Sequence, residues 1–355
     1  MLNADAPAPL RMMGAKGIAP GLKPDAIVTL VCAIVDGSDA VLAETARGTL
    51  AKFPQPILEG AFSSDLQARV LELLAEVHYA DAAVVSRLLG AQHITSHALE
   101  HVAARANESI GELVASSDSV LLQFPRVIEK LYMNRRVRMS TSDRLIDLAV
   151  RNELELDIPA FKQAAAAIQN QLIPEPTEEP SFDDELFRKV EELSRETPIL
   201  DEDTHEVDDE GEEKLKGKFQ PLYTQIAQMT ISQKIRRATL GNGAERMLLI
   251  RDTNRLVATA AATSPMLNES EAMRIAASRS VSDDVLRIIA MNRDFTRNYQ
   301  VKLNLVSNPR TPFSFSSRLI PHLRDNDLRS LSKSRNVPGA IQTAVRQQLQ
   351  RKRDG

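Results

Sequence analysis

The feature that most constrains the fold is a period of 42 residues that occurs in three copies in the C-terminal part of the chain. Each copy carries an arginine at the same place: Arg251, Arg293 and Arg335. The apolar positions that align are Ala244, Leu286 and Leu328; Met247, Ile289 and Leu331; Val257, Tyr299 and Ile341; and Ala261, Leu303 and Val345. A fixed period of this length is typical of helical repeats, in which each short unit buries its apolar face against the next.

A similar pattern of short helical stretches continues outside the three copies. Apolar residues recur at helical spacing over stretches of about 10 to 14 residues, separated by Pro, Gly, Ser-Asp or Asn-Arg breaks. Pro54, Pro125, Pro312 and Pro338 stand where helices are expected to begin, because proline at the first helical position loses no hydrogen bond. No alternating apolar run bounded by turns appears on either side of residues 174–213, so no strands are predicted there. The predicted fold class is all-α, an α-solenoid of stacked short helices in two modules.

Charge is distributed unevenly along the 355 residues. Residues 1–173 have a net charge of −4, residues 174–213 carry 3 basic and 18 acidic side chains, and residues 214–355 carry 25 basic and 10 acidic side chains. High net charge and few apolar residues predict that 174–213 is an acidic, largely disordered linker. Within it, Ser181, Leu186, Val190 and Leu193 have the spacing of a short amphipathic helix, which either docks on another surface or forms transiently with no partner.

Four segments are therefore expected: a flexible leader at 1–24, an N-terminal helical-repeat module at 25–173, the acidic linker at 174–213, and a basic C-terminal helical-repeat module at 214–355. Met12 or Met13 is an alternative start. The single cysteine, Cys32, excludes an intrachain disulfide and fits a reducing, cytoplasmic location. It lies in an apolar run that is too short to span a bilayer, so we expect a buried helix and no membrane span.

The stretch SDAVLAETARGTLAKFPQPIL, residues 38–58, and the three 42-residue copies together resemble HEAT and armadillo repeats. Units of that family pair helices, with a polar residue at the start of the first helix and proline or asparagine at the turns. The resemblance implies an α-solenoid with a concave binding surface. It implies no catalytic activity, since such folds act mainly as scaffolds or adaptors in protein–protein interactions.

The sequence offers no set of residues for catalysis. Gly-rich phosphate loops of the Walker or dinucleotide type, nucleophile elbows and HExxH motifs are absent. His93, His97 and His101 have the i, i+4 spacing of zinc ligands. However, Thr95 and Ser96 favour a helix N-cap, which places His93 before the helix, and no further His or Cys cluster stands nearby to complete a site. We therefore predict no catalytic residues, no metal and no cofactor, and rank an enzyme on a helical-repeat fold as the least favoured alternative.

The basic module is the expected contact surface for a macromolecular partner. The candidate binding residues are Arg251, Arg279, Arg293, Arg297, Lys333 and Arg335. If the units stack in register, the three repeated arginines form a row that suits an acidic protein segment or another polyanion. Binding of a nucleic-acid backbone is the alternative, although the chain has no Trp for base stacking.

Two other interpretations of the same charges remain open. The repeated arginines stand where helices are expected to end, so they can serve as C-terminal caps that interact with the helix dipole. The acidic linker is also tethered to the basic module, so an intramolecular contact between the two is possible at high effective concentration.

Overall fold

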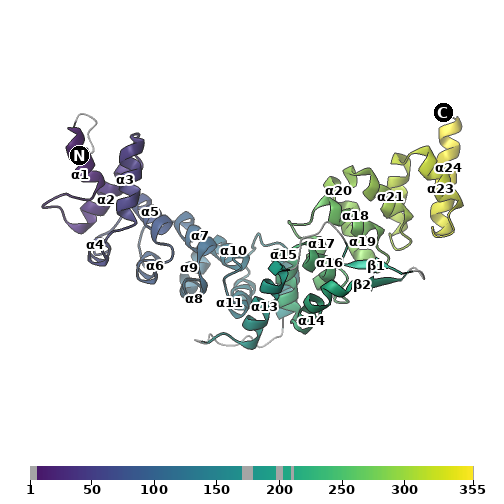
Figure 1. Ribbon diagram of the computed structural model, residues 1–355, viewed down its shortest axis with the longest axis horizontal. Helices are drawn as coiled ribbons and strands as arrows, with labels where there is room; N and C mark the ends of the chain where they lie inside the picture. Colours follow the sequence, from purple (N-terminus) through teal and green to yellow (C-terminus); the bar gives the residue numbers. More distant parts are fainter. Residues whose placement is uncertain (1–5, 170–178, 197–202, 209–211, 355) are drawn as a thin grey trace. The chain divides into compact units, whose positions relative to one another are not determined.

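The computed structural model describes residues 6–169, 179–196, 203–208 and 212–354. These residues form 24 α-helices, two short 3-10 helices and one two-stranded antiparallel hairpin. Figure 1 draws the helices as coiled ribbons and the hairpin as the arrows β1 and β2. The prediction of an all-α fold is confirmed. The parts of the acidic segment at 174–178, 197–202 and 209–211, and the first five residues of the expected leader, lie outside the described residues.

The chain divides into two compact units, Met1–Ile158 (unit 1) and Pro159–Gly355 (unit 2). The sequence had placed the end of the first module at residue 173. The division falls earlier because helix α12 (Phe161–Ile168) packs against α15 (Ile231–Leu240) and α17 (Arg255–Ala262) of unit 2. Ala164 and Ile168 are buried there, so α12 belongs to the second core.

Unit 1 contains eleven helices in its described residues. They are α1 (Ala8–Ala15), α2 (Pro24–Val35), α3 (Ala40–Leu50), α4 (Gln55–Ala61), α5 (Ala68–His78), α6 (Ala82–Leu89), α7 (Ser96–Arg105), α8 (Glu108–Ala115), α9 (Asp118–Gln123), α10 (Pro125–Met133) and α11 (Met139–Arg151). Helices pack on others close in sequence: α2 on α3 and α4, α5 on α7, and α7 on α10. The apolar run around Cys32 forms α2, with Cys32 buried as predicted.

The helix boundaries follow local chemistry. Asp39 and Asp81 cap α3 and α6 by accepting hydrogen bonds from the first free backbone N–H groups, and Thr95 does the same for α7. Pro125 is the first residue of α10, as expected. His93 precedes α7, which agrees with the prediction that Thr95 starts that helix.

The expectation of a flexible leader over 1–24 is wrong for residues 8–15, which form α1. Ala15 is fully buried, and Arg11 lies 3.5 Å from the Asp39 carboxylate. Pro7 and Pro9 do not interrupt this helix, because Pro7 is its N-cap and Pro9 falls in its first turn. Both Met12 and Met13 lie inside α1.

Unit 2 has thirteen helices in its described residues and also holds the hairpin. After α12 come α13 (Phe182–Glu196), β1 (His205–Val207), β2 (Glu213–Leu215), α14 (Gln220–Gln228), α15, α16 (Gly243–Leu249), α17, α18 (Glu269–Ala277), α19 (Asp283–Met291), α20 (Arg293–Arg297), α21 (Tyr299–Ser307), α22 (Phe313–Leu319), α23 (Asp325–Lys333) and α24 (Gly339–Asp354). The 3-10 helices are η1 (Gly217–Phe219) and η2 (Ile320–His322).

Positions 42 residues apart fall near the C-terminal ends of α16, α19 and α23. Met247 of α16, Ile289 of α19 and Leu331 of α23 are all buried. The aligned positions Val257, Tyr299 and Ile341 fall in α17, α21 and α24. Val257 and Ile341 are also buried. The apolar register read from the sequence therefore marks core positions.

The described parts of residues 174–213 form one helix and part of the hairpin. Residues 182–196 form α13, at the place where the sequence predicted an amphipathic helix, and Leu186, Phe187 and Val190 are buried. Apolar residues at helical spacing bury one side of this helix although its other side is acidic. The rest of the described segment contains β1 and the start of β2, which pair antiparallel with Val207 opposite Glu213.

In each unit one buried asparagine, which we call the asparagine latch, joins two helices: Asn134 joins α10 to α7, and Asn308 joins α21 to α18. In unit 1, Asn134 at the C-terminus of α10 donates from Nδ2 to the carbonyls of Ala103 and Ala106, both at 2.9 Å, and accepts from the Arg136 N–H. In unit 2, Asn308 at the end of α21 donates to the carbonyls of Ala276 and Ser278 at 2.9 and 2.7 Å. Its Oδ1 accepts from the Arg310 N–H at 3.0 Å. These bonds satisfy carbonyls at the end of α7 and α18 that no helical N–H can reach.

Candidate functional site in unit 2

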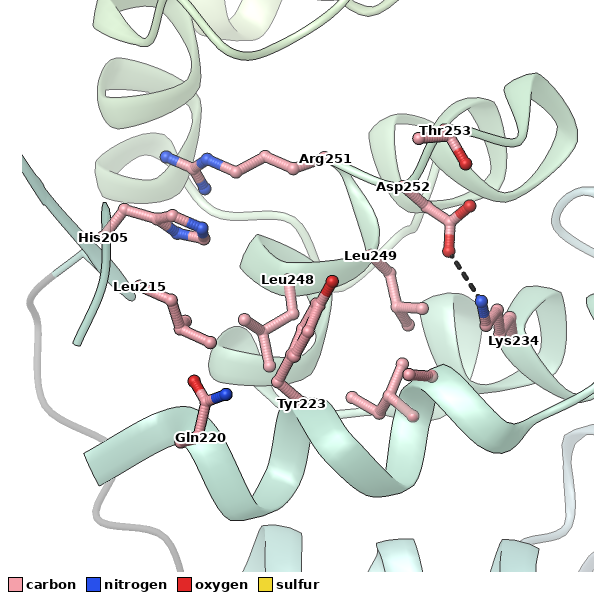
Figure 2. A pocket seen from close by; sticks show the side chains of 12 residues that line it. His205, Leu215, Gln220, Tyr223, Lys234, Leu248, Leu249, Arg251, Asp252 and Thr253 are labelled. Carbon is pink, nitrogen blue, oxygen red and sulfur yellow. Dashed lines mark hydrogen bonds and ion pairs between the residues drawn. The ribbon is translucent and has the colours of Figure 1, made fainter. Parts of the chain in front are cut away.

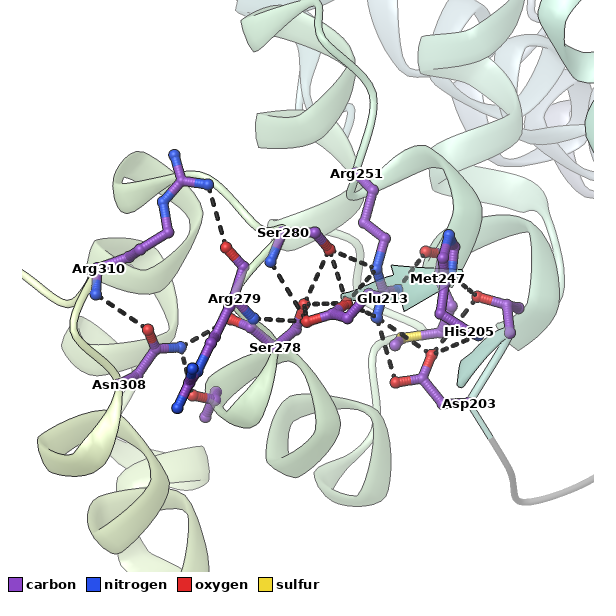
Figure 3. A network of polar contacts seen from close by, with 12 residues as sticks. Asp203, His205, Glu213, Met247, Arg251, Ser278, Arg279, Ser280, Asn308 and Arg310 are labelled. Atoms are coloured by element: carbon purple, nitrogen blue, oxygen red, sulfur yellow. Dashed lines mark hydrogen bonds and ion pairs between the residues drawn. The ribbon is translucent and has the colours of Figure 1, made fainter. Parts of the chain in front are cut away.

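The hairpin lies against the end of α16 and the loop that follows α18, and it brings acidic side chains to basic and hydroxyl groups. Figure 3 shows Glu213 of β2 surrounded by Arg251, Ser278 and Ser280. We call Arg251, Ser278, Arg279 and Ser280, which surround the Glu213 carboxylate, the Glu213 site. It joins residues that are up to 67 positions apart in the sequence.

The carboxylate of Glu213 receives hydrogen bonds on both oxygens. Its Oε1 accepts from the backbone N–H groups of Arg279 and Ser280 at 2.6 and 3.3 Å. The Ser278 hydroxyl donates to the same carboxylate at 2.8 Å, and the Ser280 hydroxyl donates to Oε2 at 2.7 Å. Two hydroxyls and two consecutive backbone N–H groups that point at one anion form the kind of nest that binds carboxylates and phosphates.

Arg251 supplies the positive charge of the site. Its Nη2 lies 3.2 Å from Glu213 Oε2 and 3.2 Å from both carboxylate oxygens of Asp203, and its Nη1 donates to the Met247 carbonyl at 2.8 Å. The Arg251 side chain is only 7% exposed. A buried guanidinium with two carboxylate partners is held in one orientation, because its planar fork fits them. The residue predicted to face a partner therefore faces the chain's own acidic segment.

Electrostatics keep Glu213 ionised. Burial on its own would raise the pKa of this carboxyl, but the hydrogen bonds from Ser280 and Ser278 and the charge of Arg251 outweigh that effect and lower the pKa to about 2. Nearby, the pKa of His205 is lowered, first by burial and then by the charge of Arg251. The site thus holds a permanent anion beside a permanent cation at neutral pH.

A pocket of about 460 Å³ adjoins the hairpin, shown in Figure 2. Leu215, Ile226, Leu248 and Leu249 form apolar walls, and Tyr223 of α14 stands beside them with 47% of its surface exposed. The remaining lining residues are His205, Gln220, Ala227, Lys234, Arg251, Asp252 and Thr253. The volume falls in the range of small-molecule sites. Its charged groups already have partners, since Lys234 pairs with Asp252 at 3.0 Å and Arg251 with the hairpin.

The other predicted binding residues lie apart from the Glu213 side chain or contribute only backbone to its site. Arg279 offers its N–H to Glu213, while its side chain is exposed. Arg293 and Arg297 are exposed at the two ends of α20, and Arg297 pairs with Asp294 at 3.1 Å. Lys333 ends α23, and Arg335 lies in the turn before α24; both are exposed.

The three repeated arginines therefore have three different environments. Arg251 follows α16 and is buried among carboxylates, Arg293 begins α20, and Arg335 is exposed in a turn. Arg293 does not cap the C-terminus of α19 as the sequence suggested, because Asn292 both ends α19 and accepts hydrogen bonds from the first residues of α20. Equal spacing in the sequence fixes the apolar positions but not what the polar positions contact.

Part of the basic charge of this half is not on the surface. Arg236 and Arg237 of the KIRR stretch at 234–237 are among the most deeply buried side chains. Arg237, 1% exposed, forms ion pairs with Glu191 of α13 and Glu245 of α16, and its Nε lies 3.0 Å from the Glu245 carboxylate. Arg246 pairs with Glu271 at 2.8 Å, also in the interior. These arginines join helices of unit 2, and a fraction of the excess charge is thereby neutralised inside the fold.

The histidines at 93, 97 and 101 have no metal arrangement. His93 contacts the Asp65 carboxylate at 3.0 Å, and the ring of His101 packs edge-on against Tyr79. Across the described ranges, no group of three or more His, Cys, Asp or Glu side chains is placed to hold a metal ion. In the same ranges no helix is long and apolar enough to cross a membrane.

Sequence reasoning missed Asp203, Glu213, Ser278 and Ser280 as members of one site. Each is an ordinary surface residue type, and the stretch that holds Glu213 was assigned to a linker. The only local signal was the loop Ser278-Arg279-Ser280 with two hydroxyls beside an arginine. The sequence leaves open a contact between the acidic segment and the basic module, but it does not indicate that Glu213, 65 positions before Ser278, is the residue that makes it.

Comparisons with known proteins found no relative. No protein-family model matches the chain, and neither a curated protein nor a solved structure is detectably similar to it.

Proposed function

We propose that the protein is a non-enzymatic adaptor of the helical-repeat type, and that unit 2 binds an extended acidic segment of a partner protein. The observation that supports this most directly is the docking of the chain's own acidic segment. Glu213 lies in β2 and Asp203 lies two residues before β1, and both pair with Arg251. A surface that holds one acidic strand in this way has the charge and hydrogen-bond donors to hold another.

The exposed basic residues of unit 2 extend this argument beyond the Glu213 site. Arg279, Arg293, Arg297, Lys333 and Arg335 are exposed, and residues 214–355 carry 25 basic against 10 acidic side chains. Such an excess speeds association with an acidic partner and disfavours basic ones. We propose these five residues as contacts for the parts of the partner that flank its docked carboxylates.

The test combines capture from the native cell with direct titration. The full chain and a double variant, Arg293→Glu with Arg335→Glu, are used as baits, and recovered proteins are identified by mass spectrometry. The matched control, Arg351→Glu with Arg353→Glu, makes the same charge change at the end of α24. We expect a partner that the full chain and the control retain and the double variant loses, and whose acidic segment, as a synthetic peptide, binds the full chain directly.

Two results would count against the proposal. Equal recovery of every protein by all three baits would show that Arg293 and Arg335 do not contact a partner. Binding of duplex or single-stranded DNA at micromolar concentration, with a steep loss between low and moderate salt, would replace the acidic peptide with a nucleic-acid backbone.

A further inference from the structure

The Glu213 site has more hydrogen-bond donors than one carboxylate can use. Two hydroxyls, two backbone N–H groups and two guanidinium nitrogens of Arg251 all lie within 3.3 Å of the Glu213 oxygens. A carboxylate has two oxygens with about four lone-pair positions, whereas a phosphomonoester offers three strongly accepting oxygens. The donor set therefore suits oxyanions in general, because its six donors outnumber the about four lone-pair positions of the Glu213 carboxylate.

The loop that supplies these donors is held by residues that follow α21, and not by the hairpin. On its far side, Asn308 donates to the Ser278 carbonyl at 2.7 Å, and Arg310 donates to the Arg279 carbonyl at 3.1 Å. These bonds orient the peptide units of the loop so that the N–H groups of Arg279 and Ser280 face Glu213. The donors would keep this orientation if the carboxylate left, because none of these supporting bonds involves the hairpin.

The hairpin is attached to the site mainly by polar contacts. Among its described residues, 203–208 and 212–216, only Thr204 is buried, and Val207 opposite Glu213 is 68% exposed. Hydrogen bonds and ion pairs that are replaced by equivalent ones in another ligand contribute little net free energy, while buried apolar area resists removal. An element with little apolar contact opens locally at low cost.

From these three observations we propose that Ser278, Arg279, Ser280 and Arg251 form a receptor for an oxyanion side chain of an extended peptide, and that Glu213 is its built-in competing occupant. The oxyanion is a carboxylate or a phosphomonoester. This inference rests on the proposed adaptor function and names the group of the partner that the site recognises. Because the competitor is tethered to its receptor, its effective concentration is high, and a partner binds only when it matches the receptor better or is itself locally concentrated.

The test uses a fluorescent peptide with the chain's own sequence at 203–216, DTHEVDDEGEEKLK, titrated by anisotropy into full-length protein. The key variant is Glu213→Gln, which weakens the resident occupant. The matched control is Glu206→Gln, an equal charge change on the same hairpin at an exposed position. We expect Glu213→Gln to bind the peptide at least about tenfold more tightly than wild type or the control, because the competing bound state is removed.

Two further arms identify the receptor and the oxyanion. Adding Ser278→Ala and Ser280→Ala to the Glu213→Gln chain is expected to abolish the gain, since the hydroxyl donors are lost. A peptide with phosphoserine at the position of Glu213 tests the phosphate source: tighter binding than the parent peptide assigns a phosphopeptide, and weaker binding assigns a carboxylate. A peptide with Gln at this position is expected to bind the Glu213→Gln chain weakly. Its affinity should match that of the parent peptide for the chain that also carries Ser278→Ala and Ser280→Ala.

Equal affinity of wild type, Glu213→Gln and Glu206→Gln for both charged peptides would overturn the inference. Folding of each variant is checked by thermal melting, and Glu213→Asp, which retracts the carboxylate by one methylene, gives a second route with an expected intermediate gain. Failure here is distinguishable from failure of the adaptor function. A partner that depends on Arg293 and Arg335 in the capture experiment, together with no peptide gain, would leave the adaptor role standing and remove only the receptor.

Discussion

The two units use the same asparagine latch but different loops beside it. In unit 1, the C-cap of α7, Ala106, is followed directly by Asn107, which is the N-cap of α8. In unit 2, Ser278 ends α18, and three residues separate it from Ser282, the N-cap of α19. The added residues supply the backbone N–H groups and the Ser280 hydroxyl that face Glu213. A short insertion beside a shared structural bond thus gives one unit an anion site and leaves the other without this loop.

A second difference concerns where each unit places its ion pairs. In unit 1 they are partly exposed, as in Arg69 with Asp36 and Arg138 with Glu108. In unit 2, Arg237 with Glu191 and Glu245, and Arg246 with Glu271, are in the interior. Surface pairs contribute little to stability, whereas removal of one member of a buried pair leaves an uncompensated charge. Unit 2 should therefore be the more sensitive of the two to single charge substitutions.

The largest effect is expected for Arg237→Met. It removes the buried guanidinium from Glu245, which is fully buried, and from Glu191, which still pairs with Arg195 at 3.1 Å. The expected cost is about 3 to 5 kcal/mol. We expect α13 to lose protection in hydrogen exchange and unit 2 to melt at lower temperature. The control Arg297→Met removes an exposed pair and should cost at most about 0.5 kcal/mol. Equal melting temperatures for the two variants would show that burial of the charges is not what stabilises unit 2.

The asparagine latch tests what the two units share. Asn134→Ala and Asn308→Ala each leave two carbonyls at a helix end without a donor, at an expected cost of about 2 to 3 kcal/mol per variant. Hydrogen exchange should rise in α7 to α10 for the first variant and in α18 to α21 for the second. Asn152→Ala, which removes an exposed bond to the Leu148 carbonyl, serves as the control with a cost below about 1 kcal/mol. A loss of stability in only one of the two variants, Asn134→Ala or Asn308→Ala, would show that the two asparagines are not equivalent.

The pH dependence of Glu213 sharpens the comparison further. Its folded pKa of about 2 lies below the ordinary 4.5, so its contribution to stability is complete above about pH 4.5 and disappears as the pH falls towards 2. The melting temperature of wild type should exceed that of Glu213→Gln by about 2 to 4 °C at pH 7, after solvent screening, and the difference should vanish near pH 2. The melting temperature of Glu206→Gln should differ little from that of wild type, and this difference should not change in the same way between pH 7 and pH 2.

The smallest effect is expected at Cys32 in unit 1. Burial, and next the charge of Asp36, raise the pKa of this thiol to about 12. At pH 8 almost no thiolate forms, so iodoacetamide should label the native chain negligibly within an hour and label the urea-unfolded chain fully. Rapid labelling of the native chain would indicate that α2 opens readily.

Local patterns in the sequence determined most of the helical architecture. Helix positions, proline starts, the Thr95 cap and the buried positions of the 42-residue period are encoded by residues within a turn or two of each other. The sequence predicted α13 from its apolar spacing but missed α1, whose first turn holds Pro9. The HEAT and armadillo resemblance remains a prediction.

Only the tertiary structure decided what the charged residues do. Arg251, Arg293 and Arg335 are equivalent in the sequence, yet the first is buried against Glu213 and the other two are exposed. The contacts that separate them join residues 38 positions apart for Arg251 and Glu213, and 46 apart for Arg237 and Glu191. An apolar side chain needs only a core, and its spacing predicts that core. A charged side chain is stabilised by one particular partner within a few ångströms, and which partner lies there depends on how distant segments pack.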